Sequence, residues 1–160
     1  MSRKLTARLT AILVAVLFVA AACGDDDGDD SSGDDGGSDA DVAVVLTEWA
    51  VTADPTTADA GSLVFEATNE GGDAHELVIV RGDDPEALPI DDTGKVIEDD
   101  LAEGDFIGEI EEFDSGGTES ATFDLDAGDY ILFCNIVEEE ADGQFESHFL
   151  EGMVTEFVVS

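Results

Sequence analysis

Four side chains with soft donor atoms lie in the part of the chain after residue 70. They are His75, Cys134, His148 and Met153, and the two histidines are the only ones in the 160-residue sequence. Thiolate, imidazole and thioether groups are the donors that soft metal ions prefer. Cys134, His148 and Met153 follow one another near the C-terminus. The set therefore indicates a candidate site for a soft metal ion.

Cys134 has three other interpretations. A disulfide with Cys23, the other of the two cysteines, is suggested by the cysteine count alone. It cannot form if Cys23 is lipidated. A nucleophilic role would need an exposed thiol of low pKa, whereas the apolar run Tyr130–Cys134 favours burial. A structural cysteine in the core remains open as the third interpretation.

The elements that must position these side chains are short apolar runs in residues 42–160. In several runs Phe, Val and Ile alternate with Glu, Thr and Asp, which is typical of half-buried antiparallel strands. Short helical turns are predicted only within Asp84–Leu88 or Lys95–Ala102. We predict an all-β domain over residues 42–160, a Greek-key β-sandwich. The predicted strands are Val42–Val51, Ser62–Thr68, His75–Val80, Phe106–Phe113, Thr118–Leu125, Tyr130–Asn135 and Met153–Val159.

The N-terminal segment predicts export. Residues 1–22 place three basic side chains ahead of an apolar run of about twelve residues, too short to span a bilayer. Small residues directly before Cys23 resemble a bacterial lipobox. We predict a lipoprotein signal peptide over 1–22 and an extracytoplasmic protein that is anchored to the cell membrane by lipid on Cys23. An ordinary signal peptide, the alternative, would also export the chain.

Residues 24–41 contain only Gly, Asp, Ser and Ala, and nine of them are Asp. Such a segment has little to bury and repels itself, so residues 23–41 are predicted to be a disordered tether that includes the lipidated cysteine. Calcium binding is the alternative for the aspartates, but they do not follow the pattern of a calcium loop.

The charge of the chain limits its partners. The sequence has 41 Asp and Glu against five Lys and Arg, and after residue 22 the only bases are Arg81 and Lys95. Nucleic acids and anionic membrane surfaces are bound by clustered bases, so direct binding to either is excluded. The acidity indicates a hydrated, soluble surface or the steering of a cationic partner, which salt would weaken.

Two motifs surround the soft donors. In Asp73–Val80 (DAHELVIV) a histidine stands at the entry to an apolar strand. In Leu125–Asn135 (LDAGDYILFCN) the pattern Gly-x-Tyr-x-x-x-Cys leads to the thiol, and His148–Met153 (HFLEGM) adds His-x4-Met. With the length and strand pattern of residues 42–160, these motifs resemble the cupredoxins, the blue-copper domains that include plastocyanin, azurin and halocyanin. The likeness is nearest to lipid-anchored bacterial members.

The resemblance implies a type 1 site in which His75, Cys134, His148 and Met153 bind one copper ion that cycles between Cu(I) and Cu(II). Ala74 and Asn135, next to the ligands, are candidates to bond the thiolate or fix the loop. A thiolate, two imidazoles and a weak axial thioether suit copper in both oxidation states. Zinc would accept the same donors, although structural zinc sites rarely use Met. Cys134 is expected to be buried, and His148 is the expected route for electrons.

One departure from plastocyanin lies between Cys134 and His148. Thirteen residues, NIVEEEADGQFES, stand where plastocyanin has a much shorter loop. The acids of this loop are expected near the metal edge, where a carboxylate that reached the ion would change its spectrum.

We therefore predict that the protein is not an enzyme but a carrier of single electrons between membrane-associated redox proteins. Its partners would be one electron donor and one electron acceptor. The acidity of the chain is compatible with cationic partners. A copper-delivery protein would use the same ligands and is the alternative, and an acidic interaction domain without metal is the third interpretation. A multicopper oxidase would need more than two histidines. Trp49 and Tyr130 are interpreted as core aromatics.

Overall fold

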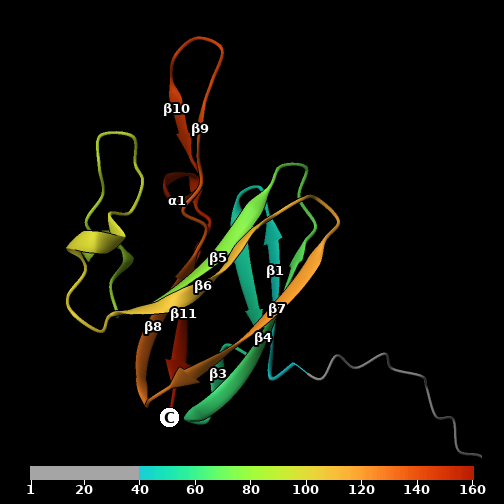
Figure 1. The fold of residues 1–160 in the computed structure, drawn as a ribbon, viewed down its shortest axis with the longest axis vertical. Coiled ribbons are helices and arrows are strands. Elements are labelled where there is room, and N and C mark those ends of the chain that lie inside the picture. The colour runs from blue at the N-terminus through green and yellow to red at the C-terminus, as the bar shows by residue number, and fades with distance from the viewer. Residues whose placement is uncertain (1–39) are drawn as a thin grey trace, which may run out of the picture. The chain divides into compact units, whose positions relative to one another are not determined.

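The alternating segments of the sequence form strands in the computed structural model, which describes residues 40–160 (Figure 1). Two 3-10 turns, η1 and η2, and one short helix interrupt them. The elements are β1 (Val42–Thr47), β2 (Ala50–Asp54), β3 (Thr57–Ala58), β4 (Gly61–Asn69), β5 (His75–Arg81), η1 (Pro85–Ala87), η2 (Glu98–Asp100), β6 (Phe106–Phe113), β7 (Thr118–Leu125), β8 (Gly128–Phe133), β9 (Val137–Glu139), β10 (Phe145–Ser147), α1 (His148–Glu151) and β11 (Val154–Val159).

Two sheets face each other. One has the strand order β2-β1-β4-β7 and the other the order β3-β11-β8-β5-β6. In the second sheet β8 is antiparallel to both β5 and β11, with Val78 and Val154 each paired to Phe133. The start of β5, the end of β8 and the start of β11 therefore lie together at one end of the sandwich. These three strand ends carry or adjoin His75, Cys134 and Met153.

The main core lies between the sheets. Alternate residues of β1 and β4 are buried, among them Leu46 and Phe65, and they pack in one cluster with Leu77, Leu132 and Phe157. Burying a large apolar side chain stabilises the fold by about 1.5–3 kcal/mol. The cluster also includes Cys134 and Met153, so the candidate site is built into the end of the core.

A second apolar cluster covers the outer face of the five-stranded sheet. Val78, Val80 and Phe133 point to that face and pack with Val96 of the β5–β6 connection and Phe149 of α1. β5 is therefore buried on both faces, which explains why its sequence is apolar without alternation. The covering segment, coloured yellow-green, stands beside β5 and β6 in Figure 1.

The predicted mostly-β sandwich of two sheets is confirmed, with two differences in its elements. The predicted strand Val42–Val51 is two strands, β1 and β2, which fold back at Glu48 and Trp49 and pair Leu46 with Val51. Folding back brings the apolar residues of both halves to the same side, where Val44, Leu46 and Val51 are all buried. Each of the two alternative segments for a helical turn contains one, η1 or η2.

The second difference concerns the long loop after Cys134. Part of it is a hairpin, β9 and β10, in which Glu139 pairs with Phe145. The following residues form α1, a single helical turn too short to give a helical periodicity in the sequence. Figure 1 shows the hairpin, in red-orange, projecting beyond the sandwich.

The predicted signal peptide and the lipidation site at Cys23 lie outside the described residues, as does the tether up to residue 39. Asp41, the last residue of the predicted tether, already bonds to β4: its N–H donates to the Val64 carbonyl, and its carboxylate accepts from the Val64 N–H. Among the helices of residues 40–160, none has the length and hydropathy of a membrane span.

Candidate metal centre

Three of the predicted ligand side chains meet at the end of the sandwich. The Nδ1 atoms of His75 and His148 lie 3.2 Å apart, and the Cys134 Sγ lies 3.3 Å from His148 Nδ1 and 3.9 Å from His75 Nδ1. All three residues are fully buried. Two imidazole nitrogens and a thiol sulfur, far apart in the sequence, thus face one small volume.

These separations fit ligands of a single ion. In zinc sites metal–nitrogen bonds are about 2.0 Å and metal–sulfur bonds about 2.3 Å, so two donors that share an ion are no more than about 4.3 Å apart. The three pairs lie 3.2, 3.3 and 3.9 Å apart and meet that condition. Two imidazoles and a thiolate, with a buried methionine beside them, are a donor set suited to one copper ion.

The thiol of Cys134 is held at the end of β8. Its backbone N–H donates to the Met153 carbonyl at 3.0 Å, and its Sγ accepts from the Glu76 N–H at 3.5 Å. Burial raises the pKa of Cys134 to about 11, against the lowering effect of the Glu76 N–H. Without a cation the group is a neutral thiol at pH 7, and a bound metal would have to displace its proton.

His148 is the first residue of α1, and Ser147 caps that turn. The Ser147 hydroxyl accepts from the Leu150 N–H at 3.2 Å and donates to the Gly94 carbonyl at 2.8 Å. The serine thereby ties α1 to the β5–β6 connection. The direction of the His148 ring is set by this capped turn and the packing of its neighbours.

The ring of His148 does not reach the surface. The expected role of His148 as the route for electrons would have placed its ring at the surface. Its exposed fraction is 0%, and Trp49 packs edge-on against it with 5.1 Å between ring centres. The turn between β1 and β2 lies over the ring, and only long-range packing brings it there. Trp49 is half-buried and packs against the main core as well as on His148. Tyr130 is a core residue as predicted.

Met153 returns the chain to the site after α1. Its N–H donates to the His148 carbonyl at 2.9 Å, and its side chain is fully buried in the cluster that holds Cys134. The return depends on Gly152, whose φ of 122° is a conformation that residues with a Cβ rarely adopt. A Cβ there would also stand 3.2 Å from the Trp49 carbonyl.

The acids of the long loop form a separate group. Carboxylate oxygens of Glu138, Glu140 and Glu146 lie within 4.8 Å of one another on the β9–β10 hairpin, and this group does not include the soft donors. Burial, followed by repulsion from neighbouring acids, raises the pKa of Glu146. In residues 40–160, no carboxylate of this loop belongs to the group of soft donors, so the expected approach of a loop acid to the metal position is not observed.

The two residues predicted to support the ligands differ in what they contact. The Asn135 side chain bonds the backbone of Val96 at 2.7 and 3.0 Å and donates to Glu98 at 2.9 Å, so it fixes the β5–β6 connection beside Cys134. Ala74 has no side-chain hydrogen-bonding group. The amide that bonds the thiol belongs to Glu76, which the spacing did not single out.

Sequence reasoning also missed Asn69 and Glu48. The buried Asn69 amide donates to the Asp73 and Phe113 carbonyls and accepts from the Gly71 N–H, so it shapes the turn that leads into His75. The Glu48 carboxylate lies 3.0 Å from His75 Nε2. The one available signal was the position of Glu48 at the break in an apolar run, which does not distinguish it from the other acids.

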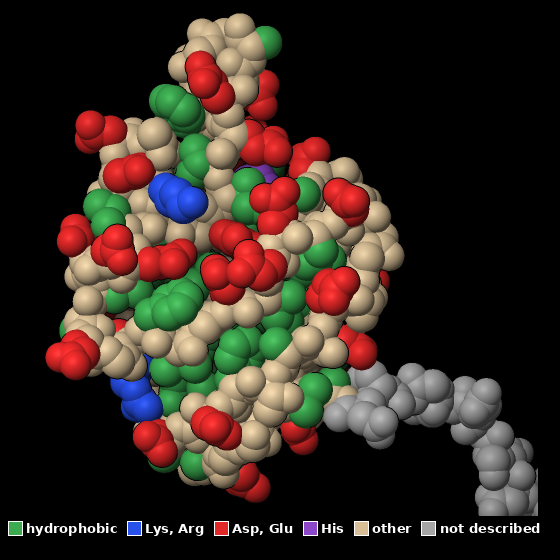
Figure 2. Space-filling view, in the orientation of Figure 1, with side chains coloured by type: hydrophobic (Ala, Val, Ile, Leu, Met, Phe, Trp, Pro, Cys, Tyr) green, Lys and Arg blue, Asp and Glu red, His purple; other side chains and the backbone are tan. Residues whose placement is uncertain are grey.

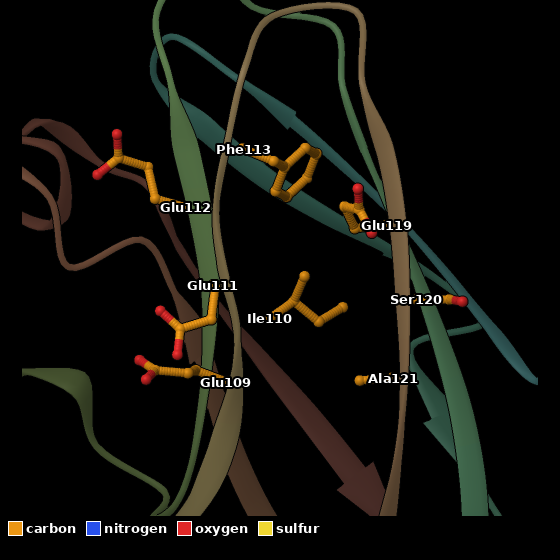
Figure 3. A pocket seen from close by; sticks show the side chains of 8 residues that line it. All are labelled: Glu109, Ile110, Glu111, Glu112, Phe113, Glu119, Ser120 and Ala121. Carbon is orange, nitrogen blue, oxygen red and sulfur yellow. The ribbon is translucent and has the colours of Figure 1, made fainter.

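Acidic side chains are spread over the face of the domain in Figure 2, with few Lys or Arg among them. A shallow groove of about 370 Å³ lies between β6 and β7, and several glutamates are among the residues that line it. Ile110 and Phe113 point into it from β6, and Glu109 and Glu111 lie on the other side of the strand (Figure 3). Because Phe113 pairs with His75, one end of the groove lies beside the candidate metal centre.

Comparison with solved structures identifies the fold. The structure superposes with a TM-score of 0.50 on the crystal structure of dithionite-reduced auracyanin from the photosynthetic bacterium Roseiflexus castenholzii, at 20% identity over 74% of this chain and 94% of that one. It superposes on auracyanin B with a TM-score of 0.51, at 20% identity over 74% and 87% of the two chains. The described residues therefore have the cupredoxin fold. No family model and no curated protein matches the sequence.

Proposed function

We propose that this chain is a type 1 copper protein of the cupredoxin family that carries single electrons between redox proteins. The observation that carries the proposal is the convergence of His75 Nδ1, His148 Nδ1 and Cys134 Sγ in a fully buried position. Met153, buried in the same cluster as Cys134, would supply a thioether as the fourth ligand. When bound there, copper would supply a centre that gains and releases one electron.

The residues of the chain would hold the donors still while the electron moves. A backbone hydrogen bond joins Cys134, just after β8, to Met153, just before β11. His148 is held by the Ser147 cap. Ligands that are held in a geometry intermediate between those preferred by Cu(I) and by Cu(II) reduce the rearrangement that accompanies each electron transfer. The Glu76 N–H would donate to the thiolate, a contact that tunes the potential of such sites.

Burial favours a carrier over a copper-delivery protein or an enzyme. A delivery protein must let an acceptor reach the ligands, and a catalytic metal needs an open position for substrate. Here the three donors are all fully buried, and Trp49 covers the outer side of His148. The ion would therefore be retained, and only electrons would be exchanged with a partner.

The proposed partners are a redox donor and a redox acceptor outside the cytoplasm, and the proposed anchor is lipid on Cys23. The signal-like residues 1–22 and the small residues before Cys23 support the location. The 32 acids and two bases of residues 42–160 favour cationic partners, because complementary charge speeds encounter. The groove between β6 and β7, which ends near His75, is a place where such a partner would meet acidic side chains.

The test is the spectrum of the domain after addition of one equivalent of Cu(II). We expect an intense visible band from thiolate-to-copper charge transfer and a narrow copper hyperfine splitting, both lost in Cys134→Ser and bleached by a reductant. Cys134→Ser is a matched control because it leaves both histidines and every acid in place. A weak Cu(II) signal that survives the substitution would place the metal on surface carboxylates and refute the proposal.

A further inference from the structure

One carboxylate touches a candidate ligand from its outer side. The Oε1 atom of Glu48, in the turn between β1 and β2, lies 3.0 Å from Nε2 of His75, the ring nitrogen that faces away from Cys134 and His148. The same oxygen accepts from the N–H groups of Gly72 and Asp73 at 2.9 and 3.0 Å. Three donors from one short segment thus fix the position of this oxygen.

The contact between Glu48 and His75 is partly buried. The Glu48 side chain is 26% exposed and the His75 side chain 0%. Gly71 packs so closely on the pair that a Cβ at that position would lie 2.7 Å from His75 Nε2 and would also collide with the Glu48 carboxylate. The acceptor oxygen of this contact is therefore held by two backbone amides and covered on one side by the backbone of Gly71.

The other imidazole of the centre has no such contact. The Nε2 atom of His148 is buried and lacks a hydrogen-bond partner among the described residues. The two rings therefore differ in what their outer nitrogens meet: a carboxylate at His75 and the indole of Trp49 near His148. Of the two rings, His75 alone carries a carboxylate contact.

We infer that Glu48 is a positioning residue for His75, which fixes the ring tautomer with its proton on Nε2 and lowers the reduction potential of the bound copper. The inference rests on the proposed function. A neutral imidazole has one N–H, and a carboxylate can only accept, so the proton belongs on Nε2. The Nδ1 lone pair is then free and faces Cys134 and His148, as a metal ligand requires.

The charge of Glu48 carries the second half of the inference. The Glu48 oxygen accepts from two backbone N–H groups and from His75, and a glutamate ordinarily carries a negative charge at neutral pH. A carboxylate that accepts from a ligating imidazole makes that ligand more basic, and a more basic ligand with a nearby negative charge favours Cu(II) over Cu(I). The donor must then be more strongly reducing to pass its electron to this centre.

Two substitutions separate the hydrogen bond from the charge. Glu48→Gln keeps an oxygen that can accept from His75 Nε2 and removes the charge, whereas Glu48→Ala removes both. Glu156→Gln is the matched control, because it removes one negative charge from an exposed position of β11. Midpoints of urea unfolding for each copper-free variant show whether the fold is retained.

The first readout is the tautomer of His75 in the copper-free protein at pH 8, measured by ¹⁵N NMR of the imidazole. We expect protonation at Nε2 in the wild type, in Glu48→Gln and in Glu156→Gln, and a mixture of tautomers in Glu48→Ala. Protonation of wild-type His75 at Nδ1 would overturn the inference. This result does not depend on copper, so it can fail while the proposed function stands.

The second readout is the reduction potential of the copper-loaded protein. We expect Glu48→Gln to shift the equilibrium about tenfold toward Cu(I), a rise of about 59 mV for one electron. Glu156→Gln should stay near the wild type. If both glutamine variants gave the same potential, the role of the charge would be refuted although the wild type still showed a blue-copper spectrum. If the wild type gave no such spectrum, the proposed function itself would fail.

Discussion

The indole of Trp49 packs edge-on against the imidazole of His148, with 5.1 Å between the ring centres. This contact joins the turn between β1 and β2 to the start of α1, two segments about 100 residues apart in the sequence. The indole lies beside an imidazole whose outer nitrogen is buried and has no hydrogen-bond partner among residues 40–160. The outer side of the candidate centre is therefore protected by an aromatic ring, and that protection can be removed by substitution.

Trp49→Ala is expected to open the centre. Loss of a buried aromatic side chain costs about 3–5 kcal/mol, and because Trp49 is only half-buried we expect about 1–3 kcal/mol, measured by urea unfolding of the copper-free protein. A soluble chelator should also remove copper faster, since water and ligand reach His148. Trp49→Phe keeps a ring and should lie between the two. Equal rates of copper loss in all three proteins would show that Trp49 does not protect the centre.

Copper uptake should release protons. Burial raises the pKa of the Cys134 thiol to about 11, so the thiol is protonated at neutral pH and must lose its proton to bind the ion. Near pH 7 we expect about one proton per copper ion from this group, and an affinity that rises with pH up to the pKa of the thiol. Titration calorimetry in two buffers of different ionisation enthalpy measures the number. Cys134→Ser should lack this proton, and an equal release from both proteins would contradict the thiolate ligand.

The main strands were predictable because their signal is local. In β6 and β7 the predicted bounds, Phe106–Phe113 and Thr118–Leu125, are those of the structure. Candidate donors were also easy to find, since a chain with two histidines and one cysteine beyond residue 23 offers few choices. Their convergence depends on β5, β8 and β11 being neighbours, which the topology shows and the spacing only suggested.

The surroundings of the candidate ligands could not be predicted in the same way. Glu48 is one of 41 acids, and it reaches His75 because β1 folds back at a turn that the apolar run Val42–Val51 hides. The cover of Trp49 over His148 likewise depends on how the sheets and α1 pack. Such contacts join segments 27 or more residues apart, and neither periodicity nor motif spacing records them.

Electron exchange should depend on the charge of the reaction partner. With 32 acids and two bases in residues 42–160, a cationic oxidant such as tris(1,10-phenanthroline)cobalt(III) should oxidise the reduced protein faster at low salt than at high salt. The screening length falls from about 10 Å at 0.1 M to about 3 Å at 1 M, so most of the enhancement should disappear over that range. An anionic oxidant, hexacyanoferrate(III), should show the opposite trend. Stopped-flow rates that are independent of salt for both reagents would argue against electrostatic steering.

Lipid attachment can be tested apart from the copper site. In a bacterial host, the full chain should incorporate a labelled fatty acid and remain with the membrane fraction. Cys23→Ser should lose both the label and the attachment, because it lacks the sulfur that the lipid modifies. Cys134→Ser is the control and should retain both, since it changes only the thiol of the domain. Labelling of Cys23→Ser would contradict the lipobox interpretation.

The stability of the copper-free domain should depend on pH through two glutamates on one face of the five-stranded sheet. Glu109 pairs with Val78, so Glu76, two residues before Val78 on β5, is its diagonal neighbour. Burial, together with repulsion from Glu109 and Glu98, raises the pKa of Glu76 to about 7 against the lowering effects of the Asn135 N–H and Lys95. Because the folded-state pKa lies above the ordinary value of 4.5, this carboxyl contributes stability at low pH that is lost as pH rises through 7.

Glu109→Gln removes the like charge from this pair and should recover part of the lost stability. Like charges on neighbouring strands cost about 0.2–1 kcal/mol, so we expect a gain of that size at pH 8 and none at pH 4, where the carboxyls are protonated. Urea unfolding of the copper-free protein at the two pH values measures it. Glu119→Gln, on the exposed side of β7, removes one charge without touching the pair and should give a smaller gain. A gain for Glu109→Gln that was the same at pH 4 and pH 8 could not arise from ionised glutamates and would require another origin, such as packing of the new side chain.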